Sequence, residues 1–263
     1  MMKILITGGD GYICKSIFDA LKTKYNITTI SRDDCDLTSA TMVNDYFLDK
    51  FFDVVIHCAA CGSKTPREDN WEIMNNNLKM YYNLLNNRNR FGKFINFGSG
   101  AEIFSSDSPY GLSKKVIYKS ISNTNNFYNI RIFAVFDENE LNTRFIKNNI
   151  NRYIKKESIL IHQNKIMDFF YMGDLIKLVE YYVDNEYLPK EIDCKYSNSF
   201  SLKEIAHVIN NLNNYQVNIE IDNQEEGISY IGNYADLNIN YVGLQDGIKE
   251  TYNNLISKKE NIK

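Results

Sequence analysis

Residues 3–14, KILITGGDGYIC, decide the fold. An apolar run leads into a turn with Gly8 and Gly11, and an amphipathic stretch follows at once, so the sequence predicts a strand, a tight turn and a helix. Glycine at both positions lets backbone N–H groups approach a pyrophosphate at the helix N-terminus, where the helix dipole favours negative charge. Cys14 takes the place of a third glycine and is small enough for the helix to pack closely on the strand. We therefore expect a dinucleotide site with contacts from Thr7, Gly8, Gly11, Tyr12 and Ile13.

Outward from this turn, short apolar runs alternate with amphipathic stretches through residues 1–140. The expected strands are Lys3–Thr7, Ile27–Ile30, Asp53–Cys58, Lys93–Phe97 and Ile130–Phe136. The expected helices are Gly11–Lys24, Thr38–Lys50, Trp71–Arg90 and Pro109–Ser122. This alternation predicts an α/β fold, with a Rossmann-type doubly wound parallel sheet forming a dinucleotide-binding domain.

The regular pattern loosens in residues 141–263. This part is expected to form a small C-terminal α/β lobe that mainly binds substrate, with late segments able to return to the Rossmann core. Its expected elements are the helices Leu141–Lys155, Gly173–Asn185, Ser201–Asn213 and Gly243–Leu255 and the strand Ser158–His162.

The charge balance argues against nucleic acid and membranes as partners. The chain has 30 Lys and Arg residues and 33 Asp and Glu residues, a net charge of −3, and no long run of one sign. The N-terminus enters the first strand without the apolar stretch of a signal peptide, and no later segment is apolar enough to span a bilayer. A cytoplasmic location is therefore expected.

Cysteines and histidines give no sign of a metal site. The 5 cysteines are scattered, as is usual for reduced thiols in a large intracellular domain. Cys58 and Cys61 are spaced as C-x-x-C but lack a second pair or nearby histidines, so we interpret them as small residues that line a strand end. His57 lies within an apolar strand and is interpreted as a core residue, not as a base.

The end of the second strand distinguishes between the two nicotinamide dinucleotides. A 2′-phosphate needs a hydroxyl and a cation there, whereas a free ribose 2′-OH needs a carboxylate. Ser31 and Arg32 stand at this end, so the sequence favours NADP(H) over NAD(H), with Arg32 as the phosphate ligand. Asp33 and Asp34 follow and partly cancel the positive field, which leaves Arg32 as a solvated surface charge as the alternative.

A Tyr-x-x-x-Lys pair on the predicted helix 109–122 is the main candidate for catalysis. Tyr110 and Lys114 are four residues apart and so share one helical face, where the ammonium favours the ionised phenol and proton exchange with an alcohol or ketone. The fourth strand leads into Gly98-Ser99-Gly100, and ligands of doubly wound sheets bind at such strand ends. Ser99 is therefore expected to hydrogen-bond the same substrate oxygen.

Several further segments follow the pattern of one known family. They are TGGDGYI at 7–13, Asp36-Leu37, His57-Cys58-Ala59-Ala60, Asn77, Ser99, Tyr110, Lys114, Ile130-Arg131-Ile132, DFFYMGD at 168–174 and SLKEI at 201–205. Together they resemble the extended short-chain dehydrogenases/reductases, the nucleotide-sugar epimerases, dehydratases and reductases, over nearly the whole chain. The resemblance implies additional cofactor contacts from Asp36, Leu37, Cys58, Ala59, Ala60, Asn77, Tyr110 and Lys114.

The resemblance also implies the chemistry. Tyr110 acts as acid and base, Lys114 binds the nicotinamide ribose and tunes Tyr110, and Ser99, with Gly100 beside it, contacts the sugar carbonyl. The sugar C4 then exchanges hydride with the nicotinamide. The implied substrate is a nucleotide-diphosphate sugar.

Departures from the family pattern exclude some of the reactions that the family carries out. Family dehydratases carry an Asp-Glu pair directly after the catalytic hydroxyl, where this chain has Gly100 and Ala101, with Glu102 one step away. The similar GDP-fucose synthases use a cysteine two residues after the serine for epimerisation. This chain has Ala101 at that position, and alanine cannot transfer a proton. Keto reduction and 4-epimerisation remain, and because Ser31 and Arg32 indicate NADPH, the usual source of reducing hydride, reduction of a C4 keto group is favoured. The alternatives are a 4-epimerase with tightly bound nicotinamide and a non-catalytic NADP-sensing protein.

Two expectations concern the rest of the substrate site and the assembly. The arginine that contacts the diphosphate in relatives is replaced by Met167, and Arg144 or Lys165 is the candidate substitute, with ordinary surface cations as the alternative. Members of the family commonly dimerise through two helices, which here are Met74–Arg90 and Pro109–Ser122. A homodimer is therefore expected.

Overall fold

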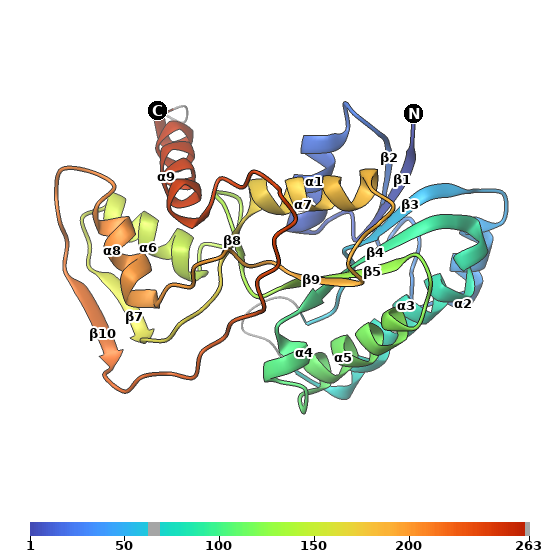
Figure 1. Ribbon diagram of the computed structural model, residues 1–263, viewed down its shortest axis with the longest axis horizontal. Helices are drawn as coiled ribbons and strands as arrows, with labels where there is room; N and C mark the ends of the chain where they lie inside the picture. The colour runs from blue at the N-terminus through green and yellow to red at the C-terminus, as the bar shows by residue number, and fades with distance from the viewer. Residues whose placement is uncertain (63–68, 261–263) are drawn as a thin grey trace. The chain divides into compact units, whose positions relative to one another are not determined.

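The structure is a computed structural model that describes residues 1–62 and 69–260. The chain divides into two compact units (Figure 1). The first consists of Met1–Ile132 with Val179–Ile192, and the second of Phe133–Leu178 with Asp193–Lys263. Helix α7, Met172–Asp184, contributes residues to both.

A six-stranded sheet in the order β2-β1-β3-β4-β5-β9 forms the centre of the first unit. Its strands are β1 Lys3–Thr7, β2 Asn26–Ile30, β3 Phe52–His57, β4 Phe91–Ser99, β5 Phe127–Ile132 and β9 Glu191–Asp193. The pairs from β2 to β5 are parallel, and Thr7 at the end of β1 aligns with both Ile30 and His57. The carboxyl ends of β2, β1 and β3 therefore meet at one edge, where such sheets bind ligands.

Helices cover both faces of this sheet because its central strands are apolar on both sides. They are α1 Tyr12–Leu21, α2 Ala40–Phe47, α3 Trp71–Asn86, α4 Ala101–Phe104 and α5 Pro109–Ser122, with a 3-10 turn η1 at Arg88–Arg90. Figure 1 shows α1 on one side of the sheet and α3 and α5 on the other. Leu5 and Val55 belong to the core beneath α2, α3 and α5, to which Val43, Tyr81 and Ile117 contribute.

The C-terminal end of α7 is fixed within the first unit by lysines. Lys93 on β4 donates to the carbonyls of Tyr182, Val183 and Asn185, which a helix C-terminus leaves without intrahelical partners. Lys24 pairs with Glu180 and Asp184, with N–O distances of 2.7 Å to each. These contacts return residues 179–192 to the central sheet.

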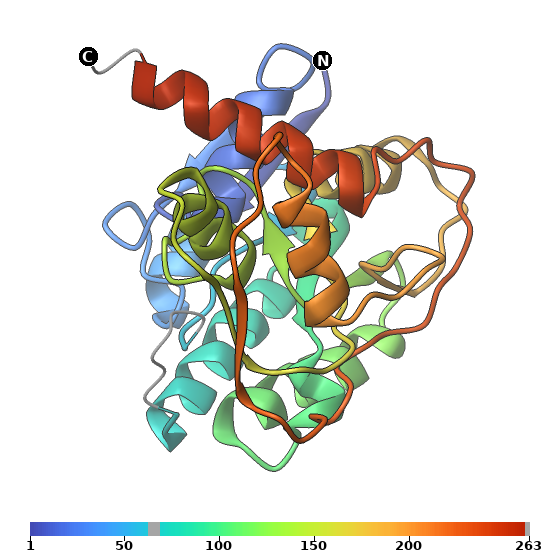
Figure 2. The ribbon, with the colours of Figure 1, turned by 90° about the vertical axis from the view of Figure 1, so that its left-hand side faces the viewer.

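The second unit is built from smaller elements. They are β6 Val135–Phe136, α6 Phe145–Ile154, β7 Ile159–Gln163, β8 Phe170–Tyr171, α8 Leu202–Asn210, β10 Ile219–Asn223 and α9 Leu244–Glu260. β7 pairs with β10 and β6 with β8, both in parallel. A capping box of Ser201 and Glu204 starts α8, which packs beside α6 and α9 around one apolar core (Figure 2).

The predicted α/β fold with a doubly wound parallel sheet is confirmed. One predicted element is wrong, because 130–136 is not a single strand. β5 ends at Ile132 and β6 begins at Val135, in another sheet. The carbonyl of Ile132 accepts from Gly100 in the first unit, and that of Ala134 accepts from Phe170 in the second. Within residues 1–62 and 69–260, no helix combines the length and apolar character needed to span a bilayer.

Candidate active site

The glycine turn after β1 has the backbone shape of a cradle. Gly8 adopts φ of +78°, and a Cβ there would lie 2.8 Å from the Ala59 nitrogen, so a side chain is excluded both by conformation and by space. The Gly11 N–H donates to the Gly8 carbonyl at 2.8 Å, and Gly9 is tied to Ile30 by a bond of the same length. Gly11 is the N-cap of α1 and leaves the helix N-terminus without a capping side chain. This arrangement suits a phosphate group.

Thr7 joins the ends of β1 and β3 beside this cradle. Its Oγ1 lies 2.8 Å from Nδ1 of His57 and accepts from the Ala59 N–H at 3.3 Å. Burial, reinforced by the charge of Lys114, lowers the pKa of His57 to about 3. The histidine is therefore a neutral structural residue at physiological pH.

The end of β2 carries hydrogen-bond donors for an anion. The Ser31 N–H and hydroxyl both donate to Asp34 Oδ2 at 2.8 Å. The Arg32 side chain is 79% exposed and reaches Asp36 only at 3.4 Å, so it is held loosely. Asp36 instead bonds the backbone and hydroxyl of Thr38 just before α2.

The other expected cofactor residues line the ends of β2 and β3. The Leu37 carbonyl accepts from Asn83 Nδ2 at 2.8 Å. Asn77 accepts from the Cys61 N–H at 2.8 Å and donates to Ser113 Oγ on α5 at 3.2 Å, so it connects the segment after β3 to the helix that carries Tyr110 and Lys114. Cys58, Ala59 and Ala60 are partly exposed, and burial raises the pKa of the Cys58 thiol well above its ordinary value.

Tyr110 and Lys114 are brought together on α5. Ser108 caps the helix by accepting from the Gly111 N–H at 3.1 Å, and Asp69 accepts from the Tyr110 N–H at 2.9 Å. Lys114 Nζ lies 5.9 Å from the Tyr110 ring centre and donates to the Phe97 carbonyl on β4 at 2.9 Å. Both side chains are largely buried at the carboxyl end of the sheet.

Ser99 is the last residue of β4, two positions beyond the carbonyl that Lys114 contacts. Its hydroxyl accepts from the Ala101 N–H at 3.2 Å, which leaves the hydroxyl proton available for donation. Its backbone N–H donates to Glu102 Oε1 at 2.9 Å. The adjacent Gly100 is buried and donates to the Ile132 carbonyl at 2.9 Å, so the serine turn is bound to β5.

Glu102 is a buried residue at this site whose contacts the sequence did not indicate. Its carboxylate pairs with Arg131 Nε at 2.9 Å, and Arg131 in turn contacts Glu191 at 2.6 Å. Removing one partner of such a buried pair costs about 3–5 kcal/mol in general. Asp69 was also missed, because it lies 41 residues before Tyr110 in the sequence.

The candidate diphosphate cations lie in the second unit. Arg144 is exposed at the N-cap of α6, and Lys165 is half-buried. Met167 packs against the apolar core of this unit. Beside it, Lys195 contacts both oxygens of buried Asp168 at 3.2 Å, and Asp168 also accepts from the Gly232 N–H at 2.8 Å. Lys195 is thus a partly buried cation that sequence spacing did not single out.

Comparison of the sequence with known families and proteins gives two matches. The NAD dependent epimerase/dehydratase family matches residues 4–192. CDP-abequose synthase from Yersinia pseudotuberculosis is 26% identical over 240 residues, which make up 80% of this chain and 84% of the relative.

Solved structures share the fold. GDP-L-fucose synthetase from Naegleria fowleri, bound to NADP, superposes with a TM-score of 0.76 at 18% identity, over 98% of this chain and 95% of the other. UDP-glucose 4-epimerase from Thermotoga maritima, with UDP-glucose, gives a TM-score of 0.81 at 16% identity, over 98% of this chain and 100% of the other. At these identities the likeness concerns the fold alone.

Proposed function

Because the chain belongs to the NAD dependent epimerase/dehydratase family, and is by that membership an NAD(P)-dependent oxidoreductase, we propose that it reduces the C4 keto group of a nucleotide-linked sugar with NADPH. The observation that carries the proposal is the placement of Tyr110 and Lys114 on one face of α5, with Lys114 bonded to β4 two residues before Ser99. These residues form a proton-donating group at the sheet end where such folds bind ligands.

The first unit would hold the dinucleotide and the second the nucleotide sugar. The cradle at Gly8 fits a pyrophosphate, since a Cβ there would fill the space and the α1 N-terminus presents backbone N–H groups. Thr7, Gly11, Tyr12 and Ile13 would surround it, and Asn77 would keep the segment after β3 in place. NADPH, when bound there, would supply the hydride.

In the proposed mechanism two side chains bind and protonate the oxygen of the C4 carbonyl. Ser99 donates its hydroxyl proton as a hydrogen bond to this oxygen, and Tyr110 transfers its phenolic proton to it as the alcohol forms. Lys114 would contact the ribose of a bound cofactor and would stabilise the phenolate that Tyr110 becomes. Ala101 provides no proton-transfer group, which supports reduction without a further step at another sugar carbon.

The proposed substrate is a nucleotide-diphosphate sugar, and the name of CDP-abequose synthase makes a CDP-linked keto sugar the first to test. Arg144 and Lys165 of the second unit are the candidates for binding its diphosphate. The test is oxidation of NADPH with CDP-, GDP-, UDP- and dTDP-linked 4-keto sugars in turn. A 4-epimerase would instead retain nicotinamide through purification and invert C4 without net oxidation, and an NADP sensor would bind cofactor without turnover.

The cofactor preference is proposed to depend on the end of β2. Ser31 offers two donors to an anion, and Arg32 extends into solvent beside them. A 2′-phosphate would take over the donors that now bind Asp34. NADP(H) is therefore the proposed cofactor, in preference to NAD(H).

Arg32→Ala is expected to raise the Kd of NADPH by about 10-fold, the value of one charge-assisted hydrogen bond in a partly solvated site, and to leave that of NADH unchanged. Fluorescence titration of both cofactors measures this. Arg88→Ala removes an exposed arginine elsewhere in the same unit and serves as the control. A wild-type chain that binds NADH more tightly than NADPH would rule out the assignment of Arg32.

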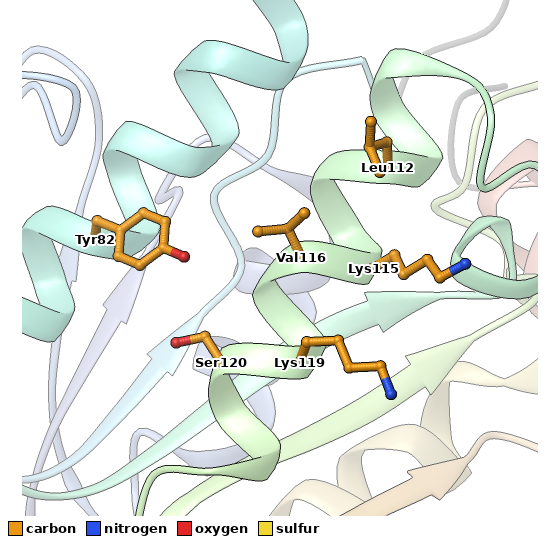
Figure 3. Close-up of a pocket in the computed structure, with 6 residues that line it drawn as sticks. All are labelled: Tyr82, Leu112, Lys115, Val116, Lys119 and Ser120. Carbon is orange, nitrogen blue, oxygen red and sulfur yellow. The ribbon is translucent and has the colours of Figure 1, made fainter.

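We further propose that α3 and α5 pair with the same helices of a second copy. A groove of about 540 Å³ lies on these helices, lined by Tyr82, Leu112, Lys115, Val116, Lys119 and Ser120 (Figure 3). Its apolar residues are partly exposed, with Tyr82 40% exposed. Association would remove them from water.

Val116→Asp is expected to convert the dimer to a monomer, because an unpaired carboxylate would be buried at the centre of the interface. Light scattering coupled to size exclusion measures the mass. Lys115→Asp, a neighbour that is exposed at the edge of the groove, should change the mass little. A wild-type chain that stays monomeric at all concentrations would refute the pairing.

A further inference from the structure

Glu102 is a buried carboxylate next to the reacting groups that the proposed chemistry leaves without a role. Its side chain is 2% exposed. Oε1 accepts the Ser99 N–H at 2.9 Å, and Oε2 accepts Arg131 Nε at 2.9 Å. The single carboxylate therefore joins the end of β4 to the neighbouring strand β5.

The fold provides a fitted space for this carboxylate. A Cβ on Gly98 would overlap Glu102 Oε1 and would lie 2.6 Å from Asn129 Nδ2, so any side chain there would displace these two groups. Asn129 is held from the other side by Asn96, with an N–O distance of 2.7 Å. The side chain is therefore fixed by neighbours on both strands.

Arg131 extends the link to the edge of the sheet. Its side chain is 6% exposed, and it bridges Glu102 to Glu191 of β9. The Tyr118 ring lies 5.1 Å from its guanidinium carbon. Arg131 on β5 thus links Glu102 of α4 to β9, and Glu102 is the member that contacts the serine turn.

A role for Glu102 in proton transfer does not fit these contacts. Each oxygen already accepts a hydrogen bond from the protein, and almost none of the side chain can be reached from outside. Burial raises the pKa of this carboxyl, while Arg131 and the Ser99 amide act in the opposite direction. Its three partners, the Ser99 amide, Arg131 and Asn129 Nδ2, are all donors, as an ionised carboxylate requires.

We propose that Glu102 is a positioning residue that fixes the Ser99 turn through the Ser99 amide and the Arg131 link. The inference rests on the proposed function in that Ser99 must contact the substrate oxygen. Its consequence is that Glu102 influences the rate only through Ser99.

The test is a double-mutant cycle with Glu102→Gln and Ser99→Ala. Glutamine has a single acceptor oxygen, whereas the Ser99 amide and Arg131 Nε each donate to a separate oxygen of Glu102. One of these bonds is therefore lost, and the turn loosens. We expect kcat to fall by about 10-fold or more in the wild-type background, since small misplacements of reacting groups are costly. In the Ser99→Ala background the same change should have no further effect, and the shape of the pH–rate profile should be unchanged. Equal losses in both backgrounds, or a lost limb of the profile, would overturn the proposal.

Glu191→Gln is the matched control, because it neutralises the other carboxylate that pairs with Arg131. The Glu191 side chain is 42% exposed and does not contact the serine turn. Its kcat should stay within about 2-fold of wild type, as expected for an exposed pair. A control that loses as much rate as Glu102→Gln would contradict a role specific to Glu102 and its contact with the Ser99 amide.

Amide exchange of the free chain separates this inference from the proposed function. The Ser99 amide should exchange about 10-fold faster or more in Glu102→Gln than in wild type and Glu191→Gln, because it loses a charged acceptor. This readout needs no substrate. A chain that reduces no keto sugar but shows this difference would contradict only the function, whereas unchanged exchange would contradict the positioning role.

Discussion

Tyr110→Phe is expected to lower kcat for keto-sugar reduction by about 10²- to 10⁴-fold, the usual contribution of a positioned general acid. The phenyl ring keeps the packing of a residue that is 8% exposed, so the fold and the cofactor affinity should be retained. Steady-state assays of NADPH oxidation, with the Kd of NADPH measured in parallel, separate the two quantities.

Tyr118→Phe is the control for this substitution. It removes a hydroxyl from the same helix, at a ring whose centre lies 5.1 Å from the Arg131 guanidinium carbon and whose hydroxyl interacts with Glu191. Its rate should stay near that of wild type. If Tyr110→Phe matched wild type in every keto-sugar assay, the catalytic assignment would have to be abandoned.

Lys114→Met is expected to lower kcat/KM by about 10²-fold and to raise the Kd of NADPH by about 10-fold, the effect of losing one or two charge-assisted hydrogen bonds. The ammonium stabilises the phenolate in the proposed mechanism. It also donates a hydrogen bond to the Phe97 carbonyl, which would lose this donor in the methionine variant. Kinetics and fluorescence titration give both values.

Lys115→Met tests whether the effect belongs to this one ammonium. Lys115 is the next residue of α5 but is exposed. It should change neither kcat/KM nor cofactor affinity by more than about 2-fold, since exposed charges contribute little. A loss of the same size in both variants would indicate a general effect of charge on the helix.

The sequence predicts the parts of this molecule that depend on local pattern. The glycine turn follows from Gly8, because its left-handed φ and the approach of Ala59 leave no room for a side chain. The placement of Tyr110 and Lys114 on one helical face follows from their spacing of four residues. The parallel sheet follows from apolar strands that alternate with amphipathic helices.

The remainder depends on contacts between distant residues. The carboxylate of Glu102 meets Arg131, 29 positions later, only once β4 and β5 are paired. The break between β5 and β6 was missed because IRIFAVF is apolar apart from Arg131 and gives no sign of where the chain passes to another unit. Lys195 was missed because its partner Asp168 is 27 residues away.

Transfer of deuterium from NADPH labelled at C4 of the nicotinamide tests the central claim most directly. Each of the two labelled stereoisomers is incubated with the chain and a nucleotide-linked 4-keto sugar, and the product is analysed by NMR and mass spectrometry. We predict that one stereoisomer places a single deuterium on C4 of the sugar as one NADPH is oxidised. Failure to label any of the CDP-, GDP-, UDP- or dTDP-linked 4-keto sugars, or inversion of C4 by nicotinamide that the purified chain retains, would contradict the account.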